Sequence, residues 1–370
     1  MQRKHAILAS VMAVGLSASL VACSSSAASP STPESSDSGS SEATGGTIWY
    51  STKNSTELVH VAMADGVVNA ANLLGFDADV MVAEADAGKQ NEQLMNLVEN
   101  MDPTAIVVNP YDSDSVSDVL KRASDKGIPY AVIDNPANNA KVDVSVLFDS
   151  IESGRAAGEE AVKLLTERYG EAKGLVVNIE GDPVSQVARD RAEGFYQIME
   201  EYPDIEVVKL ADSQAPEKAT SGVSNAIADA KASGKQVDLV NSPTDPSTLG
   251  AIEALRTNNA WFKTGEEGHV FVISHDGMGE LLDFIREGYV DAEVVIDIYG
   301  VGGIATEILS EYTLKGTPVP TSGTFTPKGA YLNEEVTFSE TEFGPTVFLA
   351  PIVVTADEVD NPLIWGNAGK

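Results

Sequence analysis

Clusters of polar side chains follow several short apolar runs in this sequence. The clusters at residues 52–57, 109–112, 134–136, 244–245 and 275–277 are rich in Asp, Asn, Ser and Thr. Such side chains donate and accept hydrogen bonds in fixed directions, which is the chemistry needed to hold a small polar ligand. Each cluster alone could equally form a turn or a helix N-cap. Their recurrence in both halves of the chain favours a common binding site.

The apolar runs before these clusters predict β-strands that alternate with helices. Residues 106–108 and 176–177 are apolar at successive positions, which is typical of parallel strands covered by helices on both faces. Two amphipathic stretches, residues 57–74 and 113–126, end before a glycine, as helices commonly do. The predicted strands are residues 47–51, 78–83, 105–109, 130–134, 142–148, 174–179, 205–210, 237–241, 270–274 and 293–298.

The order of these elements predicts the fold class. Two consecutive series of strand and helix indicate an α/β fold with two doubly wound parallel-sheet lobes. The stretch from Thr47 to Lys370 also exceeds what one hydrophobic core usually serves. In open α/β sheets, ligands bind beyond the carboxyl ends of the strands. The polar clusters follow the strands at these ends.

Composition argues against several other classes of protein. A formal net charge of −32 repels phosphate backbones, so we expect no nucleic acid partner. Cys23 is the only cysteine, which leaves no disulfide or thiolate metal site. His60, His269 and His275 have no metal-binding spacing. We therefore expect neither a metal nor a cofactor.

One glycine motif also occurs in dinucleotide-binding enzymes. Gly300, Gly302 and Ala305 fit the pattern G-x-G-x-x-A. However, no acidic residue ends a second strand about 20 positions later, where the sequence reads Gly-Thr-Pro-Val-Pro. Close helix packing explains the glycines better, and no hydrolase motif or Walker loop occurs. The sequence therefore predicts a protein that is not an enzyme.

The N-terminal residues have the pattern of an export signal. Arg3 and Lys4 precede an apolar stretch that is too short and too rich in small residues for a membrane span. This stretch ends in Leu-Val-Ala-Cys23, which resembles the bacterial lipobox. We therefore expect residues 1–22 to be a lipoprotein signal peptide and residues 23–46 to be a Ser-rich tether lipidated at Cys23. The protein would then be anchored at the extracytoplasmic face of the cell membrane.

Residues 47–331 resemble the ribose and galactose type of periplasmic binding protein, the solute receptors of bacterial ABC importers. The resemblance implies the type I periplasmic binding protein fold, in which a three-strand hinge joins two lobes that close on a small molecule. The motifs that carry it are Asn109-Pro-Tyr-Asp-Ser-Asp114, Gly127-Ile-Pro129 leading to Asp134, Arg189-Asp-Arg-Ala-Glu-Gly-Phe195, Leu249-Gly-Ala251 and Asp276-Gly277.

The resemblance also implies where the chain crosses between the lobes. The crossings fall near Phe148, near Ile296 and near Phe325. The N-terminal lobe would comprise residues 47–148 plus 297–325. The C-terminal lobe and tail would comprise residues 149–296 plus 326–370.

Several residues match the ligand-binding positions of this family. Asp134 and Asn135 match an acidic and polar pair that binds sugar hydroxyls, and Arg191 matches an arginine in an R-x-x-G turn. Thr244 and Asp245 match an Asn-Asp pair. The resemblance implies a site made of Asn54, Glu57, Asp134, Asn135, Arg191, Thr244, Asp245, His275, Asp276 and Asp297.

The same positions also show departures from the family. Glu57 and His275 stand where sugar receptors commonly have aromatic rings, and Asp297 lies beside a position where Gln is common. Such a cleft is rich in acceptors and poor in stacking surface. It favours a polyol or an amino-bearing sugar over a pyranose held by stacking.

We therefore expect a monomeric, extracytoplasmic lipoprotein that captures a monosaccharide or sugar alcohol. It would deliver this solute to an ABC permease and ATPase complex. The alternative is a sensor of a sugar or autoinducer that docks on a membrane receptor. A transcription repressor of the same fold is disfavoured, because the N-terminus has no basic helix-turn-helix.

Overall fold

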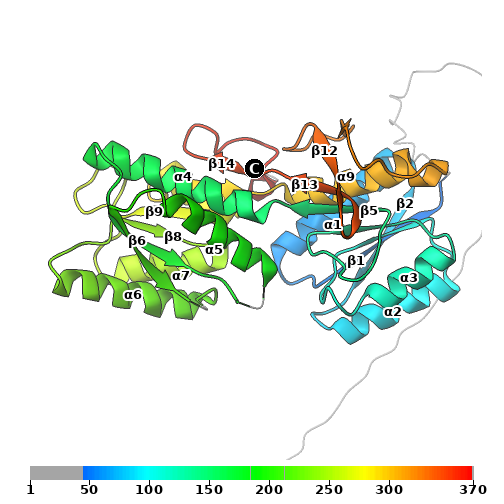
Figure 1. Ribbon diagram of the computed structural model, residues 1–370, viewed down its shortest axis with the longest axis horizontal. Coiled ribbons are helices and arrows are strands. Elements are labelled where there is room, and N and C mark those ends of the chain that lie inside the picture. Colours follow the sequence, from blue (N-terminus) through cyan, green and yellow to red (C-terminus); the bar gives the residue numbers. More distant parts are fainter. Residues whose placement is uncertain (1–44, 184, 212, 369–370) are drawn as a thin grey trace, which may run out of the picture. The chain divides into compact units, whose positions relative to one another are not determined.

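The computed structural model describes residues 45–183, 185–211 and 213–368. These residues form two mixed, mainly parallel sheets, each covered by helices on both faces (Figure 1). The expected signal peptide, most of the tether and Cys23 lie outside the described residues. Among the described residues, no helix is long and apolar enough to cross a lipid bilayer.

The first sheet has its central strands in the order β2-β1-β3-β4-β5, all parallel. The C-terminal part of the chain extends it: β13 pairs parallel with β5, and β12 and β11 follow antiparallel. The strands are β1 (Thr47–Thr52), β2 (Asp77–Val82), β3 (Ala105–Val108), β4 (Tyr130–Ile133), β5 (Val144–Phe148), β11 (Thr324–Phe325), β12 (Val336–Thr341) and β13 (Gly344–Leu349).

Alternation along the strands buries both faces of this sheet. Ala105 and Val107 pack in the core that contains α1 (Leu58–Leu73) and α9 (Ile298–Glu311). Ile106 and Val108 pack in the core that contains α2 (Ala87–Asn100) and α3 (Ser117–Asp125). Successive strand residues point to opposite faces, so an uninterrupted apolar run fills both cores. We call this sheet with α1, α2, α3 and α9 the first lobe.

The second sheet repeats the pattern in the order β7-β6-β8-β9-β10, all parallel, with β14 antiparallel at the edge. Its strands are β6 (Gly174–Ile179), β7 (Ile205–Leu210), β8 (Leu239–Asn241), β9 (Phe271–Asp276), β10 (Ala292–Val295) and β14 (Ile352–Val354). Its helices are α4 (Ser150–Tyr169), α5 (Gln186–Met199), α6 (Pro216–Ala232), α7 (Asp245–Thr257) and α8 (Gly279–Glu287). We call this sheet and these helices the second lobe.

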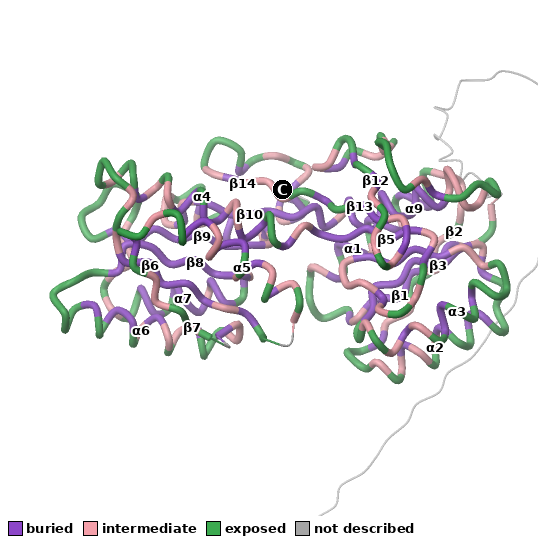
Figure 2. The backbone as a smooth tube through the Cα atoms, viewed as in Figure 1, coloured by how far each residue is buried: buried purple, intermediate pink, exposed green. Residues whose placement is uncertain are grey.

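Burial follows the layers, since the strands of both sheets and the inward faces of the helices are buried (Figure 2). The α/β fold with two doubly wound lobes is confirmed. One expected helix starts later than its pattern indicated. The backbone N–H groups of Asp114 and Ser115 donate to Asp112 Oδ1, so a turn precedes α3.

The C-terminal segment departs from the expected boundaries. Residues 326–370 were expected with the second lobe, but β12 and β13 belong to the first sheet. The chain reaches the second sheet only after Leu349, where β14 begins at Ile352. The crossing near Phe325 was therefore wrong. The physical reason is that β5 leaves an open edge, which β13 occupies over four residue pairs.

The glycines of the motif at residue 300 lie within α9. A Cβ on Gly302 would lie 2.8 Å from Met63 O on α1, so only glycine allows these helices to approach so closely. Packing explains this glycine.

Candidate functional site

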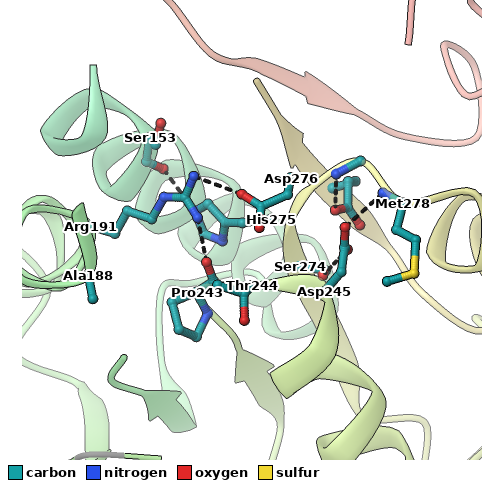
Figure 3. A network of polar contacts seen from close by, with 12 residues as sticks. Ser153, Ala188, Arg191, Pro243, Thr244, Asp245, Ser274, His275, Asp276 and Met278 are labelled. Carbon is teal, nitrogen blue, oxygen red and sulfur yellow. Dashed lines mark hydrogen bonds and ion pairs between the residues drawn. The ribbon is translucent and has the colours of Figure 1, made fainter. Parts of the chain in front are cut away.

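The carboxylate of Asp276 forms an ion pair at the end of a strand of the second lobe. Asp276 ends β9 with a φ of 101°, and Arg191 Nη2 on α5 lies 2.8 Å from its Oδ1 (Figure 3). Arg191 Nη1 donates to Pro243 O over 2.5 Å. Arg191 Nε is buried and finds no acceptor among the described residues. The Arg191 side chain is only 5% exposed, so it holds Asp276 from behind.

Asp245 lies next to this pair, at the first turn of α7. Ser274 Oγ donates to its Oδ1 over 3.0 Å, and the Met278 backbone N–H donates to its Oδ2 over 2.7 Å (Figure 3). Burial raises the pKa of Asp245 to about 7. A second buried carboxyl, Glu293 on β10, accepts from the Gly277 backbone N–H over 2.9 Å, and burial raises its pKa well above the usual range.

Thr244 directly precedes α7, beside Asp245. We call the surface formed by Thr244, Asp245 and Asp276 the second wall. The Thr244 hydroxyl is 2.8 Å from Ser247 Oγ. The side chain therefore keeps capacity for a further hydrogen bond toward the cavity that it lines.

His275 does not share this wall, although the sequence grouped it with Asp276. Its ring is buried, with Nδ1 2.7 Å from Ser242 O and Nε2 3.4 Å from Ser153 O. Burial, together with Arg191, lowers the pKa of His275 to about 3, so the ring is neutral. Adjacent residues of a strand point to opposite faces, which is why only one of the two reaches the ligand side.

The first lobe carries a similar ion pair at the ends of β1 and β4. Lys53 Nζ lies 2.7 Å from Asp134 Oδ2, and both side chains are 14% exposed. Burial alone would raise the pKa of Asp134, but the Lys53 ammonium outweighs it and holds that pKa below its usual value. Asp134 has a φ of 62°, a conformation that Asp tolerates better than most residues.

Asn54 and Glu57 form a turn before α1. Asn54 Oδ1 accepts from the backbone N–H groups of Thr56 and Glu57, over 3.1 and 3.0 Å. Asn54 Nδ2 donates to Glu57 Oε1 over 3.0 Å. The Glu57 side chain is 64% exposed and lies 3.6 Å from His60 Nε2. Asn54 thus orders the turn, whereas Glu57 projects outward.

We call the surface formed by Lys53, Asn54, Glu57 and Asp134 the first wall. Two cavities are lined by residues of these walls, and both cavities include Glu57. The smaller, of about 590 Å³, is lined by Glu57, Leu58 and Val59 at the start of α1 and by second-lobe residues that include Lys218, Thr244, Asp245, Asp276 and Met278. The larger, of about 1180 Å³, is lined by Lys53, Asn54, Glu57, His60, Asp134 and Asn135 of the first lobe and by Gln186, Arg189 and Asp190 of α5. Asn135 Nδ2 donates to Pro110 O over 3.2 Å.

Asp297 lies in the segment between β10 and α9, away from both cavities. Its Oδ1 accepts from the Gly300 backbone N–H over 2.8 Å, and its Oδ2 accepts from the Asn333 backbone N–H over 2.9 Å. Burial raises the pKa of Asp297. The carboxylate caps α9 and ties down the segment after Tyr331. The structure therefore gives it a positioning role, and no contact with a ligand follows from its place.

The structure brings seven of the ten predicted residues to the two cavities. Arg191, His275 and Asp297 are the three that line neither. The residues that sequence reasoning missed are Lys53 and a set of aromatic side chains. Their signal was weak, because Tyr111, Phe148, Phe343, Phe348 and Trp365 come from separate loops and the C-terminal segment.

Trp365 is the aromatic residue that closes the smaller cavity. Its Nε1 donates to Asp276 O over 2.7 Å, and its ring is largely buried. The residue both anchors the C-terminal segment and lines the cavity. The site thus offers carboxylates, hydroxyls and amides for hydrogen bonds, together with several rings. Within the described residues, no group of three His, Cys, Asp or Glu side chains could hold a metal ion.

A family model for the "Periplasmic binding protein domain" matches residues 48–317. This match covers most of the chain, from β1 to the residues after α9.

Individual bacterial proteins are also similar to this chain. The ribose import binding protein of Bacillus subtilis is 25% identical over 261 residues, which are 70% of this chain and 79% of that protein. The D-apiose import binding protein of Actinobacillus succinogenes is 29% identical over 228 residues, 61% of this chain and 68% of that protein. A solute binding protein of Actinobacillus succinogenes, solved with bound D-allose, aligns with a TM-score of 0.69 at 20% identity, over 85% of this chain and 99% of that one.

Proposed function

The chain belongs to the periplasmic binding protein family, and we propose that it captures a monosaccharide or sugar alcohol between its lobes for an ABC importer. The family consists of solute-binding proteins, so no bond needs to be made or broken. The protein would act as a monomer outside the cytoplasm, anchored to the cell membrane by lipid.

The smaller cavity is the observation that carries this proposal. Its lining combines the start of α1 from the first lobe with Thr244, Asp245 and Asp276 from the second. The volume of about 590 Å³ lies within the range of small-molecule sites, roughly 300–1,000 Å³. A solute with many hydroxyls would donate to the carboxylate of Asp276 and accept from neighbouring hydroxyl and ammonium groups.

The names of similar proteins support the solute class. The two import binding proteins described above are named for ribose and D-apiose, and a xylitol-binding protein of Mycolicibacterium smegmatis is 28% identical over 206 residues. These solutes are rich in hydroxyl groups, which suits a cavity lined by carboxyl and hydroxyl groups. The word "import" in two of these names supports delivery to an importer.

Closure of the lobes would couple binding to delivery. A solute that contacts the start of α1 on one lobe and Asp276 on the other stabilises the conformation in which both are close. Three connections, after β5, β10 and β13, would have to bend as the lobes approach. The closed form is then the one that a permease recognises.

A ligand screen tests the proposal. We expect one or a few neutral sugars or polyols to raise the melting temperature of the protein, since a ligand at 100 times its Kd stabilises by about 2.7 kcal/mol. Isothermal titration calorimetry should then give a stoichiometry of one. Stabilisation by amino acids, peptides or metal ions, with no response to sugars and polyols, would overturn the proposal.

The lipid anchor needs its own test, because Cys23 lies outside the described residues. Its support is the resemblance of Leu20 to Cys23 to a lipobox. In the native host, Cys23→Ser should release the protein from the membrane fraction. Mass spectrometry that found an unmodified Cys23 within an intact precursor would contradict the anchor and leave the solute proposal untouched.

A further inference from the structure

Two carboxyl groups meet in the second lobe without a cation between them. Asp245 and Glu293 are both buried, and the backbone N–H groups of two consecutive residues, Met278 and Gly277, donate to Asp245 Oδ2 over 2.7 Å and to Glu293 Oε1 over 2.9 Å, so both carboxyl groups lie at the same turn. Glu293 Oε2 is buried, and no N–H or O–H group of the described residues donates to it. Two ionised carboxylates offer only acceptors, so a hydrogen bond between them requires a proton on one.

The neighbouring groups do not neutralise this pair. Arg191 on α5 is engaged by Asp276, whose negative charge also faces the pair from β9. His275 on β9 is held neutral by burial. The remaining partners are the backbone N–H groups of Gly277 and Met278 and the hydroxyl of Ser274, which stabilise one negative charge better than two.

We propose that Glu293 is a positioning residue that shares one proton with the cavity residue Asp245, and that solute binding is therefore linked to proton uptake. This inference rests on the proposed function only for the solute and its cavity. Asp245 lines the smaller cavity, whereas Glu293 lies behind it and touches no solute. The shared proton fixes the charge that Asp245 presents to the solute.

The direction of the linkage follows from dehydration. When a neutral solute enters and the lobes close, water leaves the side of Asp245 that faces the cavity. Loss of water favours the uncharged form of a carboxyl group. The complex then binds the proton more tightly than the free protein does, so affinity falls as the pH rises. A pKa near 7 for Asp245 puts this change in the neutral range.

The ligand-free protein gives the deciding test. The pair holds its proton to higher pH in the folded state than in the unfolded state, where the pKa values are about 4. The folded state therefore binds more protons above about pH 4, and stability falls as the pH rises from there through the raised folded pKa values of the two groups. Urea unfolding at several pH values should show this slope in the full chain. Glu293→Gln should reduce it by about one proton, because the amide donates to an ionised Asp245.

Glu160→Gln is the matched control. Glu160 is a buried glutamate of the same lobe, but its oxygens are 3.0 and 3.1 Å from Lys163 Nζ and it lines neither cavity. This variant should keep the slope of the unchanged protein. Asp245→Asn serves as the second variant and should lose the slope as Glu293→Gln does. Equal slopes in the unchanged protein and in both pair variants would overturn the proposal.

Calorimetry with the solute selected by the screen, xylitol being the first probe, tests the link to binding. In two buffers of different ionisation enthalpy, the unchanged protein should take up a fraction of a proton near pH 7. Its affinity should fall by up to about tenfold per pH unit above that point. Glu293→Gln should bind without proton uptake.

Proton release on binding of a neutral solute would contradict the stated direction. If no sugar or polyol binds but the stability slopes differ as described, the proton pair stands and the proposed function fails.

Discussion

The two walls of the cleft use the same device but differ in charge balance. On each wall, a carboxylate at the end of a strand has a positive φ and is held by a cation: Asp134 by Lys53 at 2.7 Å, and Asp276 by Arg191 at 2.8 Å. On the first wall, the ammonium of Lys53 compensates the carboxylate of Asp134. The second wall adds Asp245 and Glu293, to which no cation among the described residues is paired.

This difference shows how position decides the state of a carboxyl group. Asp134 is 14% exposed and Asp245 is buried, yet the pKa of Asp134 is lowered by Lys53 whereas that of Asp245 is raised by burial and by the nearby Asp276. The first wall therefore keeps its charge across the neutral range. The raised pKa values of Asp245 and Glu293 mean that the second wall holds protons to higher pH than the first wall does.

Removal of the second-wall cation should have the largest effect. Arg191→Ala leaves Asp276 beside two further carboxyl groups without compensation and removes the bond to Pro243 O. We expect a loss of about 2–4 kcal/mol in solute binding. Calorimetric titration checks this, with Arg155→Ala as control, since Arg155 is a partly exposed arginine on α4 that lines neither cavity. Unchanged affinity in a folded Arg191→Ala variant would remove the second-wall ion pair from the binding site.

The corresponding change on the first wall should mainly affect stability. Lys53→Met strands the carboxylate of Asp134, at a cost of about 1–3 kcal/mol in the free energy of unfolding at neutral pH. The folded pKa of Asp134 is depressed, so its contribution is present above about pH 4 and is lost as the pH falls further. Urea denaturation at pH 7 and near pH 3 should show a difference that shrinks in acid. A difference that instead grew in acid would mean that Asp134 is not the carboxylate that Lys53 stabilises.

The aromatic ring shared by the C-terminal segment and the second wall should have a smaller effect. Trp365→Phe keeps an apolar ring but removes the donor to Asp276 O. We expect a loss of about 1 kcal/mol in binding, the value of one hydrogen bond. The control is Trp261→Phe, because Trp261 stacks on Tyr289 away from both cavities. Equal affinities of the two variants would place the Trp365 ring outside the functional site.

The exposed carboxylate that both cavities share should matter least. Glu57 is 64% exposed, and among the described residues its side chain contacts His60 and Asn54. Glu57→Gln should change solute affinity by less than about 1 kcal/mol, because water screens an exposed charge. A larger loss of affinity in titration calorimetry would show that closure buries Glu57 against the solute. Glu57 would then count, with Asp134, among the carboxylates of the binding site.

The central strands could be predicted closely because their pattern is local. The predicted strands at residues 174–179 and 205–210 match β6 and β7. The pairing of β13 with β5 could not be predicted, because residues 346–349 meet residues 145–148 across two hundred positions. Nothing in either segment alone specifies that partner, and the expected third crossing was wrong for this reason.

The site was predictable as a set of strand ends but less so as individual side chains. Asp276 lines the cavity, whereas the adjacent His275 points into the second lobe. Asp297 occupies a strand end but caps α9 instead. Nothing in the sequence around Glu293 indicates a role in the site, because it is a single acidic residue in an otherwise apolar strand. Its role depends on Asp245, which lies 48 positions earlier in the chain.

The late position of Trp365 in the chain affects when the smaller cavity can be completed. A ribosome makes the central strands of both sheets well before it reaches β13, β14 and Trp365. A nascent chain can therefore begin to fold both lobes while the second wall still lacks its aromatic side and the first sheet still has an open edge. We therefore expect the cavity that Trp365 lines to be completed only after nearly all of the chain has been made.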